Sequence, residues 1–175
     1  MNGIILAMEI ISKNLKETRD IAKKFLQNLK QPKEKALVIG LFGDLGSGKT
    51  TFVQFIAEAL GIEENITSPT FVIEKIYSVK SRRAGILPKA KLFNRASKIE
   101  NFDWPKRLIH TDAYRLKNGE ELRILGFEEI LNDSGNLIMI EWPENIFSIL
   151  PDNILKIEFE FVDENTRKIN SNALT

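Results

Sequence analysis

Cysteine is absent from the 175-residue chain, and histidine occurs once. The lack of cysteine excludes disulfide scaffolds, thiolate-bound zinc and thiol catalysis, and a single histidine argues against a histidine-rich metal site. A dominant charge is also lacking, because 25 basic and 24 acidic side chains leave a net charge of +1. Such a chain has no overall field that attracts it to nucleic acid or to an anionic membrane. A role with RNA must therefore depend on a local surface or on a partner.

The N-terminal segment lacks the length and the pattern of a membrane or export signal. Its first residues, MNGIILAMEII, are apolar but too short to span a bilayer, and they have neither the basic start nor the cleavage site of a signal peptide. With 43% apolar residues and the length of one ordinary domain, the chain is predicted to form a single globular domain over residues 1–175. We expect a cytoplasmic protein that has no membrane contact and is monomeric by itself.

Predicted strands and helices alternate along the chain. Apolar residues recur at helical spacing over 18–29, and Asn14 with Glu17 fits a capping box before them. Residues 36–42, ALVIGLF, are a continuous apolar run typical of a strand buried on both faces, and a second helix is predicted to run to residue 60. The alternation indicates an α/β fold with a mostly parallel sheet. Further strands are predicted at FVIEKIY (71–77), RLIHTD (107–112), NLIMIE (136–141) and, at the edge of the sheet, ILKIEFEF (154–161), with a helical stretch at 120–131.

The stretch GDLGSGKTT matches the pattern G-x-x-x-x-G-K-[ST], in which a glycine loop binds a phosphate at the start of a helix. It directly follows the predicted strand 36–42, as that mechanism requires. Lys49 is predicted to contact the β and γ phosphates and is a candidate catalytic residue, and the Thr50 hydroxyl is predicted to ligate Mg²⁺. No N-K-x-D or T-K-x-D guanine-reading motif occurs, which favours ATP over GTP. The predicted nucleotide-binding residues of the loop are Gly43, Asp44, Leu45, Gly46, Ser47, Gly48, Lys49, Thr50 and Thr51.

Two acids follow apolar strands, and both are candidates for catalysis. Glu141 ends NLIMIE and Asp112 ends RLIHTD. Ligands of open α/β sheets lie at the carboxyl ends of the strands, so the two carboxylates could flank one phosphate, one as Mg²⁺ ligand and the other as base or water-positioner. Glu141 could instead merely cap the turn before Pro143, and Trp142 could simply be a packing residue.

Two other segments leave alternatives open. In TSPTF the hydroxyls of Thr67, Ser68 and Thr70 could sense a γ phosphate, but a plain turn is as compatible with the residues. Residues 78–107 contain nine lysines and arginines against two acids. This basic inserted loop could bind RNA, although it lacks a pattern of stacking aromatics and is more typical of a solvated connection.

Four motifs, in this order, resemble the bacterial family of tRNA threonylcarbamoyladenosine biosynthesis protein TsaE, formerly YjeE. They are GDLGSGKTT, TSPTF, HTDAYRL followed by EEL and LGFEE, and IEWPE followed by LP. The resemblance covers about residues 10–167 except the basic loop, which family members usually lack. It implies a three-layer P-loop NTPase with antiparallel strands at the edges of its sheet. It also implies a Mg²⁺-dependent ATPase that acts with TsaB and TsaD proteins in the threonylcarbamoyl modification of adenosine 37, in tRNAs that read codons beginning with A.

The resemblance also assigns roles to single residues. Thr50 and Glu141 would hold Mg²⁺, Asp112 would match the family's essential acid, and Trp142 would match a tryptophan beside the metal carboxylate. Further nucleotide contacts are implied for Leu15 and Thr18, in the first helix, and for Arg167, after the last strand. Contact with tRNA would be indirect, through the partner complex.

Two other functions are compatible with the same residues. In a small-molecule kinase, Asp112 would deprotonate an acceptor hydroxyl, and labelled product would form from ATP. In a non-hydrolysing ATP-dependent binding module, the loop from Thr67 to Thr70 would change shape on binding, and Asp112 and Glu141 would be dispensable for partner binding.

Overall fold

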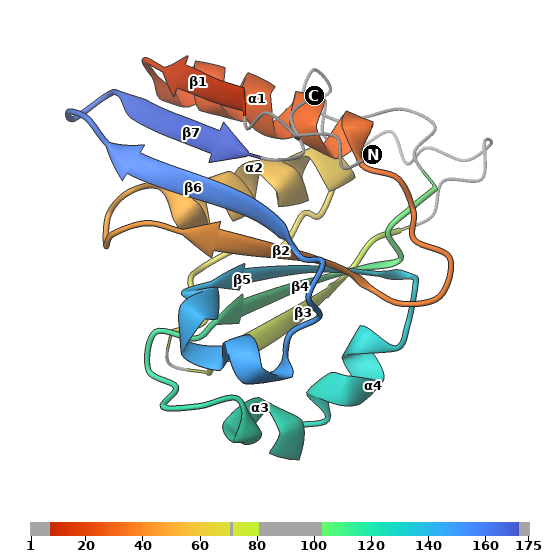
Figure 1. The fold of residues 1–175 in the computed structure, drawn as a ribbon. Coiled ribbons are helices and arrows are strands. Elements are labelled where there is room, and N and C mark those ends of the chain that lie inside the picture. Colours follow the sequence, from red (N-terminus) through yellow and green to blue (C-terminus); the bar gives the residue numbers. More distant parts are fainter. Residues whose placement is uncertain (1–7, 71, 81–102, 172–175) are drawn as a thin grey trace, which may run out of the picture.

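The computed structural model describes residues 8–70, 72–80 and 103–171, and these form one seven-stranded sheet with helices on both faces (Figure 1). In the described part of the chain, no helix is long and apolar enough to cross a membrane. The elements are β1 (Met8–Ser12), α1 (Leu15–Asn28), β2 (Leu37–Phe42), α2 (Lys49–Leu60), β3 (Glu74–Ser78), β4 (Arg107–Asp112), α3 (Glu120–Ile124), α4 (Phe127–Leu131), β5 (Asn136–Glu141), the 3₁₀ helix η1 (Pro143–Ile149), β6 (Leu155–Phe161) and β7 (Arg167–Ser171).

The sheet is mixed. Its strand order is β1-β7-β6-β2-β5-β4-β3. The four central strands β6, β2, β5 and β4 pair in parallel, whereas β3, β7 and β1 are added antiparallel at the two sides. The predicted α/β class is therefore confirmed, with the parallel pairings confined to the centre of the sheet.

The prediction that ILKIEFEF forms an edge strand was wrong. These residues form β6, which lies between β2 and β7. Ile157 and Phe159 are buried on one face, while Glu158 and Glu160 are exposed on the other. The alternation of apolar and charged residues therefore shows that one face of β6 is solvated, not that the strand lies at an edge. A strand inside a sheet can be hydrogen-bonded to neighbours on both sides and still be covered on one face only.

Two other elements differ in extent from the sequence prediction. The helical stretch 120–131 is divided into α3 and α4 by Gly126, which adopts a left-handed conformation with φ of 84°. Strand β3 begins only at Glu74, because the amides of Val72 and Ile73 turn back to the carbonyl of Pro69.

The basic inserted loop connects two neighbouring strands. Ser78 and Arg107, at its two ends, are paired residues of the antiparallel strands β3 and β4. Residues 81–102 of this loop lie outside the described residues. The predicted RNA-binding or solvated role of the loop stays a prediction.

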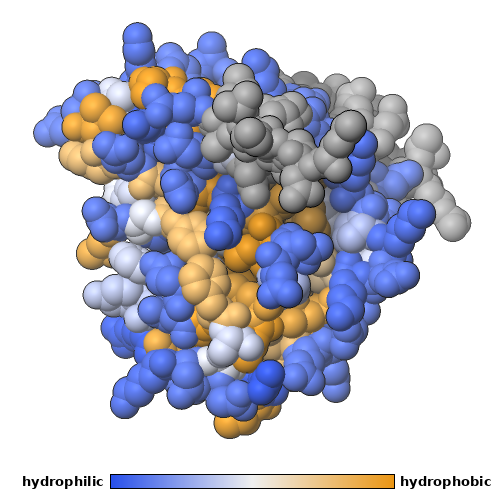
Figure 2. All heavy atoms as spheres, in the orientation of Figure 1, coloured by the Kyte–Doolittle hydropathy of each residue, from blue (hydrophilic) through white to orange (hydrophobic). Residues whose placement is uncertain are grey.

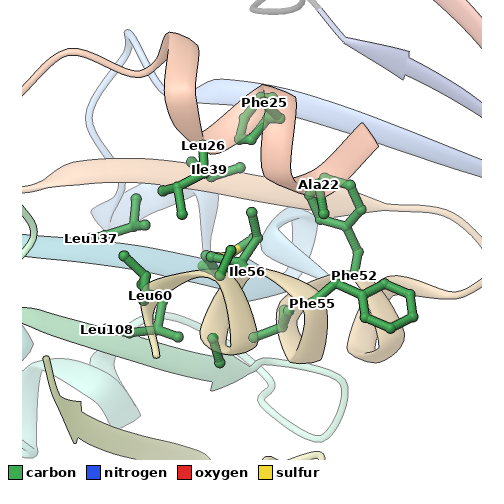
Figure 3. Close-up of a cluster of buried hydrophobic side chains, with 14 of the residues drawn as sticks. Ala22, Phe25, Leu26, Ile39, Phe52, Phe55, Ile56, Leu60, Leu108 and Leu137 are labelled. Atoms are coloured by element: carbon green, nitrogen blue, oxygen red, sulfur yellow. The ribbon is translucent and has the colours of Figure 1, made fainter. Parts of the chain in front are cut away.

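A first apolar core lies between the sheet and helices α1 and α2 (Figure 3). Phe25 of α1 and Phe52 of α2 meet edge to face with ring centroids 5.9 Å apart, and Phe52 contacts Phe159 of β6 at 5.3 Å. Each such fully buried side chain contributes roughly 1.5–3 kcal/mol through removal of apolar surface from water. This core fixes α2, and with it the loop that precedes the helix.

A second core lies on the other face of the sheet. It joins Ile109, Ile138 and Ile140 of the central strands to Leu122 of α3 and Phe127 of α4. In the space-filling view, hydrophilic residues form most of the outline and hydrophobic residues gather near the centre of the visible face (Figure 2). Strands β2, β4 and β5 contribute residues to both cores and are thus packed on both faces.

Candidate functional site

The candidate site is built at the carboxyl ends of three parallel strands. Strand β2 ends at Phe42 and leads into the glycine loop, while β4 and β5 end at Asp112 and Glu141. Asp112 and Glu141 are paired residues of neighbouring strands, and Leu41 pairs with Glu141 on the other side. The two acids therefore lie side by side next to the loop, as the positions of their strands predicted.

The glycine loop depends on backbone conformations that favour glycine. Gly43 has φ of 126°, and a Cβ atom built on it would lie 2.2 Å from the carbonyl oxygen of Phe159. Gly48, at the start of α2, has φ of 108°. Ser47 lies between them with its Oγ atom buried and without a hydrogen-bond partner among the described residues. The loop thus offers a buried hydroxyl that a ligand could engage.

Lys49 is held inside this loop. Its side chain is 4% exposed, and its Nζ atom donates to the carbonyl oxygens of Gly43 at 2.6 Å and of Asp44 at 2.9 Å. Nζ also lies 4.2 Å from the centre of the Trp142 ring, a cation–π contact. Burial lowers the pKa of the Lys49 ammonium, and the nearby charges of Glu141 and Asp112 partly oppose this effect. An anionic ligand would therefore stabilise the poorly solvated Lys49 ammonium.

Glu141 connects the first turn of α2 to strand β4. Its Oε1 atom accepts a hydrogen bond from the Thr50 hydroxyl at 2.8 Å and lies 2.8 Å from Nε2 of His110. Glu141 is 4% exposed, and His110 is completely buried. A hydroxyl and a carboxylate placed together are oxygen ligands of the kind that Mg²⁺ prefers.

Asp112 is held by the loop that contains TSPTF. Its Oδ2 atom accepts hydrogen bonds from Ser68, at 2.8 Å, and from Thr70, and its Oδ1 atom accepts one from the backbone amide of Tyr114 at 3.0 Å. Thr67 does not join this group, because its hydroxyl accepts a hydrogen bond from Lys75 instead. Of the three hydroxyls proposed to sense a phosphate, two thus contact the candidate catalytic acid.

A cavity of about 170 Å³ lies beside the glycine loop. It brings together three residues that only the family resemblance had indicated, namely Leu15 and Thr18 of α1 and Arg167 of β7. Sequence reasoning missed Phe159, Glu164 and Asn165, which complete the lining together with Ser47, Gly48 and Thr51. No local motif could have found these three, because the antiparallel pairing of β6 and β7 brings them to the loop.

Around Trp142, aromatic rings and a turn complete the site. Trp142 adopts a left-handed conformation with φ of 58°, and its ring centre lies 5.1 Å from that of Tyr114. Asn145 donates a hydrogen bond to the carbonyl of Ala113 at 2.9 Å, which ties the turn after β5 to the turn after β4. Fold and site together define a mixed α/β protein with a glycine loop, which contains the buried Lys49, beside two carboxylates.

Comparison with known proteins identifies the family. The family model described as Threonylcarbamoyl adenosine biosynthesis protein TsaE matches residues 12–87 and 93–169. Relatives named tRNA threonylcarbamoyladenosine biosynthesis protein TsaE include that of Rickettsia typhi, 39% identical over 87% of this chain and 85% of its own length. The one from Bacillus subtilis is 33% identical over 92% of this chain and 82% of its own length. The chain belongs to the TsaE family, as the four sequence motifs predicted.

A solved structure supports the same relationship. The crystal structure of YdiB from Bacillus subtilis is 28% identical to this chain and superposes with a TM-score of 0.62. The match covers 97% of this chain and 86% of that one.

Proposed function

We propose that this protein is a Mg²⁺-dependent ATP hydrolase with the three-layer P-loop NTPase fold that serves the threonylcarbamoyl modification of adenosine 37 in tRNAs. Its relatives carry the name of that biosynthesis. The observation that carries the proposal is the 2.8 Å hydrogen bond between Thr50 and Glu141, immediately beside the buried Lys49. It joins a hydroxyl at the start of a helix to an acid at the end of a strand, as phosphate and metal binding in this class requires.

The described residues fit a nucleotide. The orphaned Ser47 hydroxyl and the buried Lys49 ammonium both belong to the glycine loop, and the adjoining cavity contains the guanidinium-bearing Arg167. Backbone amides at the start of α2 would complete the contacts with the phosphates. Leu15 and Thr18 would contact the remainder of the nucleotide across the cavity.

The donor set also fits a magnesium ion. No group of three or more acidic, histidine or cysteine side chains suited to a metal occurs among the described residues. Mg²⁺ in nucleotide sites needs only one or two carboxylates, because phosphate oxygens and water supply the other ligands. Thr50 and Glu141 would hold the ion, which when bound would neutralise charge on the phosphate oxygens.

The remaining residues have distinct tasks in this proposal. Lys49 would exchange its two loop carbonyls for phosphate oxygens, a charge-assisted contact. Asp112, fixed in orientation by Ser68, Thr70 and the Tyr114 amide, would position the attacking water and accept its proton. Trp142 would keep its tilted contact with Tyr114, while the Lys49 ammonium would move from the Trp142 ring toward the phosphates.

The proposal is tested by depleting the protein in its host and measuring modified tRNA nucleosides by mass spectrometry. We expect threonylcarbamoyladenosine to fall and to be restored by the wild-type gene but not by Glu141→Ala. Unchanged threonylcarbamoyladenosine after depletion, in a cell without a second copy, would contradict the proposal. Restoration by Glu141→Ala and Asp112→Ala would instead support a non-hydrolysing binding module.

The kinase alternative is tested separately with the purified protein. Radioactive ATP is offered together with a pool of cell metabolites. We expect free phosphate as the sole labelled product, because Asp112 would act on water. A labelled metabolite would favour the kinase.

A further inference from the structure

We infer that His110 is a positioning residue whose hydrogen bond to Glu141 holds that carboxylate in the orientation needed to bind Mg²⁺ together with Thr50. This inference rests on the proposed function and extends it to a residue of β4 that would touch neither the ion nor the nucleotide.

The contact itself is enclosed. His110 is completely buried within β4, and its Nε2 atom lies 2.8 Å from Oε1 of Glu141, which is itself 4% exposed. Strands β4 and β5 are parallel neighbours, and Asp112 of β4 pairs with Glu141 of β5. His110 lies two residues before Asp112, so its ring reaches Glu141 across the spacing between these two strands. Water has little access to this bond, and an enclosed hydrogen bond to a charged acceptor is strong and fixed in direction.

The surroundings of the His110 ring indicate that its role is to donate one hydrogen bond to Glu141. A carboxylate can only accept, so Nε2 carries the proton and donates to Glu141. The other ring nitrogen, Nδ1, is buried and has no hydrogen-bond partner in the part of the chain that the structure describes. An unpaired buried polar atom costs about 1–3 kcal/mol, so an apolar residue would fill this position at a lower cost to folding. The single bond to Glu141 is therefore what this histidine contributes.

The two carboxylate oxygens of Glu141 differ in their hydrogen bonds. Oε1 accepts hydrogen bonds from both His110 and Thr50, which belong to two different elements, β4 and α2. Two donors on one oxygen fix the plane of the carboxylate, and Oε2 takes no hydrogen bond from the described residues. Outer partners of this kind orient metal ligands, and their removal typically lowers metal affinity 10- to 100-fold.

The test uses three substitutions that differ in where they place a donor. In His110→Gln the amide nitrogen takes nearly the position of Nε2, whereas in His110→Asn the shorter amide takes the position of Nδ1 and does not reach Glu141. His110→Leu removes the donor altogether. Mg²⁺ affinity is measured by calorimetry in the presence of a non-hydrolysable ATP analogue, and affinity for the analogue is also measured without divalent ions. Thermal unfolding of each free protein is recorded as well.

We expect the dissociation constant for Mg²⁺ to rise 10- to 100-fold in His110→Asn and His110→Leu and to change less than about 3-fold in His110→Gln. Affinity for the analogue without Mg²⁺ should stay within about 2-fold in all variants that fold. If His110→Leu does not fold, the comparison of Gln with Asn decides. In a Glu141→Gln background, His110→Asn should have no further effect on Mg²⁺ affinity, because the two residues act through one bond.

Equal Mg²⁺ affinity in His110→Asn and His110→Gln would overturn the inference while leaving the proposed function intact. A parallel loss of metal-free analogue affinity and Mg²⁺ affinity would also overturn it, since this is the result of general damage to the site. If instead the wild-type protein gains no analogue affinity from Mg²⁺, the proposed metal site itself fails, and the inference fails with it.

Discussion

Lys49 shows at the scale of one residue how the site combines a cost to folding with a gain in binding. Its ammonium is almost fully buried and has neutral carbonyls as its hydrogen-bond acceptors, and burial lowers its pKa. A cation in this position is poorly solvated until an anion arrives. The environment of Lys49 thus favours the binding of an anion that we propose to be a phosphate.

We expect Lys49→Met to weaken binding of an ATP analogue by about 10- to 100-fold, as loss of a charge-assisted hydrogen bond of 1.5–3 kcal/mol implies. The free energy of unfolding at pH 7 should stay the same or rise, because methionine fills the position without a charge to desolvate. Binding is measured by calorimetry and stability by urea denaturation, with the exposed Lys16→Met as control. A loss of stability that parallels the loss of binding would contradict this account.

The lowered pKa of Lys49 predicts that the stability difference between the wild type and Lys49→Met depends on pH. Because the folded pKa of Lys49 lies below the unfolded value of 10.5, the unfolded chain binds more protons between the two values. The stability of the wild type should therefore rise, relative to Lys49→Met, as pH increases through this window. Denaturation of both proteins across alkaline pH measures the difference, in which other titrating groups cancel. A difference that is independent of pH would contradict the lowered pKa.

At the scale of elements, the glycine loop offers a matched pair of positions. Gly43 and Gly46 both have positive φ, but a Cβ atom at Gly43 would meet the carbonyl of Phe159 at 2.2 Å, while one at Gly46 would have no neighbour within 4 Å. We expect Gly46→Ala to cost about 1–2 kcal/mol for the backbone conformation. Gly43→Ala should cost at least about 2 kcal/mol more, since β6 must move. Urea denaturation measures both, and equal losses would show that the contact with β6 is not rigid.

The loop that contains TSPTF provides a second element-scale prediction. Ser68 and Thr70 both hydrogen-bond to Asp112, whereas the nearby Thr67 contacts Lys75. Ser68→Ala combined with Thr70→Val should lower ATP turnover about 10- to 100-fold, because Asp112 loses its orientation, with little change in nucleotide affinity. Thr67→Ala is the control and should leave turnover within about 2-fold. If the control lowers turnover equally, the loop acts through its shape and not through Asp112.

Some of these elements could be predicted from the sequence, and others could not. GDLGSGKTT and the two strand-end acids were found because each is a contiguous pattern with a local physical cause. Strand β6 was placed wrongly because alternation reveals which face is solvated but not which strands are neighbours. The role of Ser68 and Thr70 as partners of Asp112 was hidden for a similar reason, since 42 to 44 residues separate them in sequence.

At the scale of the whole molecule, the site draws on both ends of the chain. Thr18 near the N-terminus and Arg167 near the C-terminus line one cavity because β1 pairs with β7 and β7 with β6. Leu15, Thr18 and Arg167, which the family resemblance indicated outside the four motifs, are therefore brought together by the tertiary structure. Strand β7 lies between β1 and β6 in the sheet, and the sequence did not reveal this order.

The whole molecule also sets an expectation for its activity with partners. Backbone oxygens accept hydrogen bonds from Lys49, and the Arg167 guanidinium donates to the carbonyls of Asp163 and Thr166. Hydrolase sites of the class that we propose are slow until a further group completes them. We expect ATP turnover to be slow alone and to rise at least about 10-fold when TsaB and TsaD proteins are added, with Lys49→Met as the inactive control. Rapid turnover that is indifferent to both proteins would contradict a shared site.

The contact between Lys49 and Trp142 has a practical consequence for following ligand binding. The chain has two tryptophans. The other one, Trp104, precedes the first residue of β4, whereas the site lies at the last residue of that strand, Asp112. The ring nitrogen of Trp104 donates a hydrogen bond to the carbonyl of Ser134. Withdrawal of the ammonium from the Trp142 ring would change the fluorescence of that indole and leave the emission of Trp104 as an internal reference. The unlabelled protein thus carries a fluorescent side chain in contact with the lysine that we propose to bind phosphate.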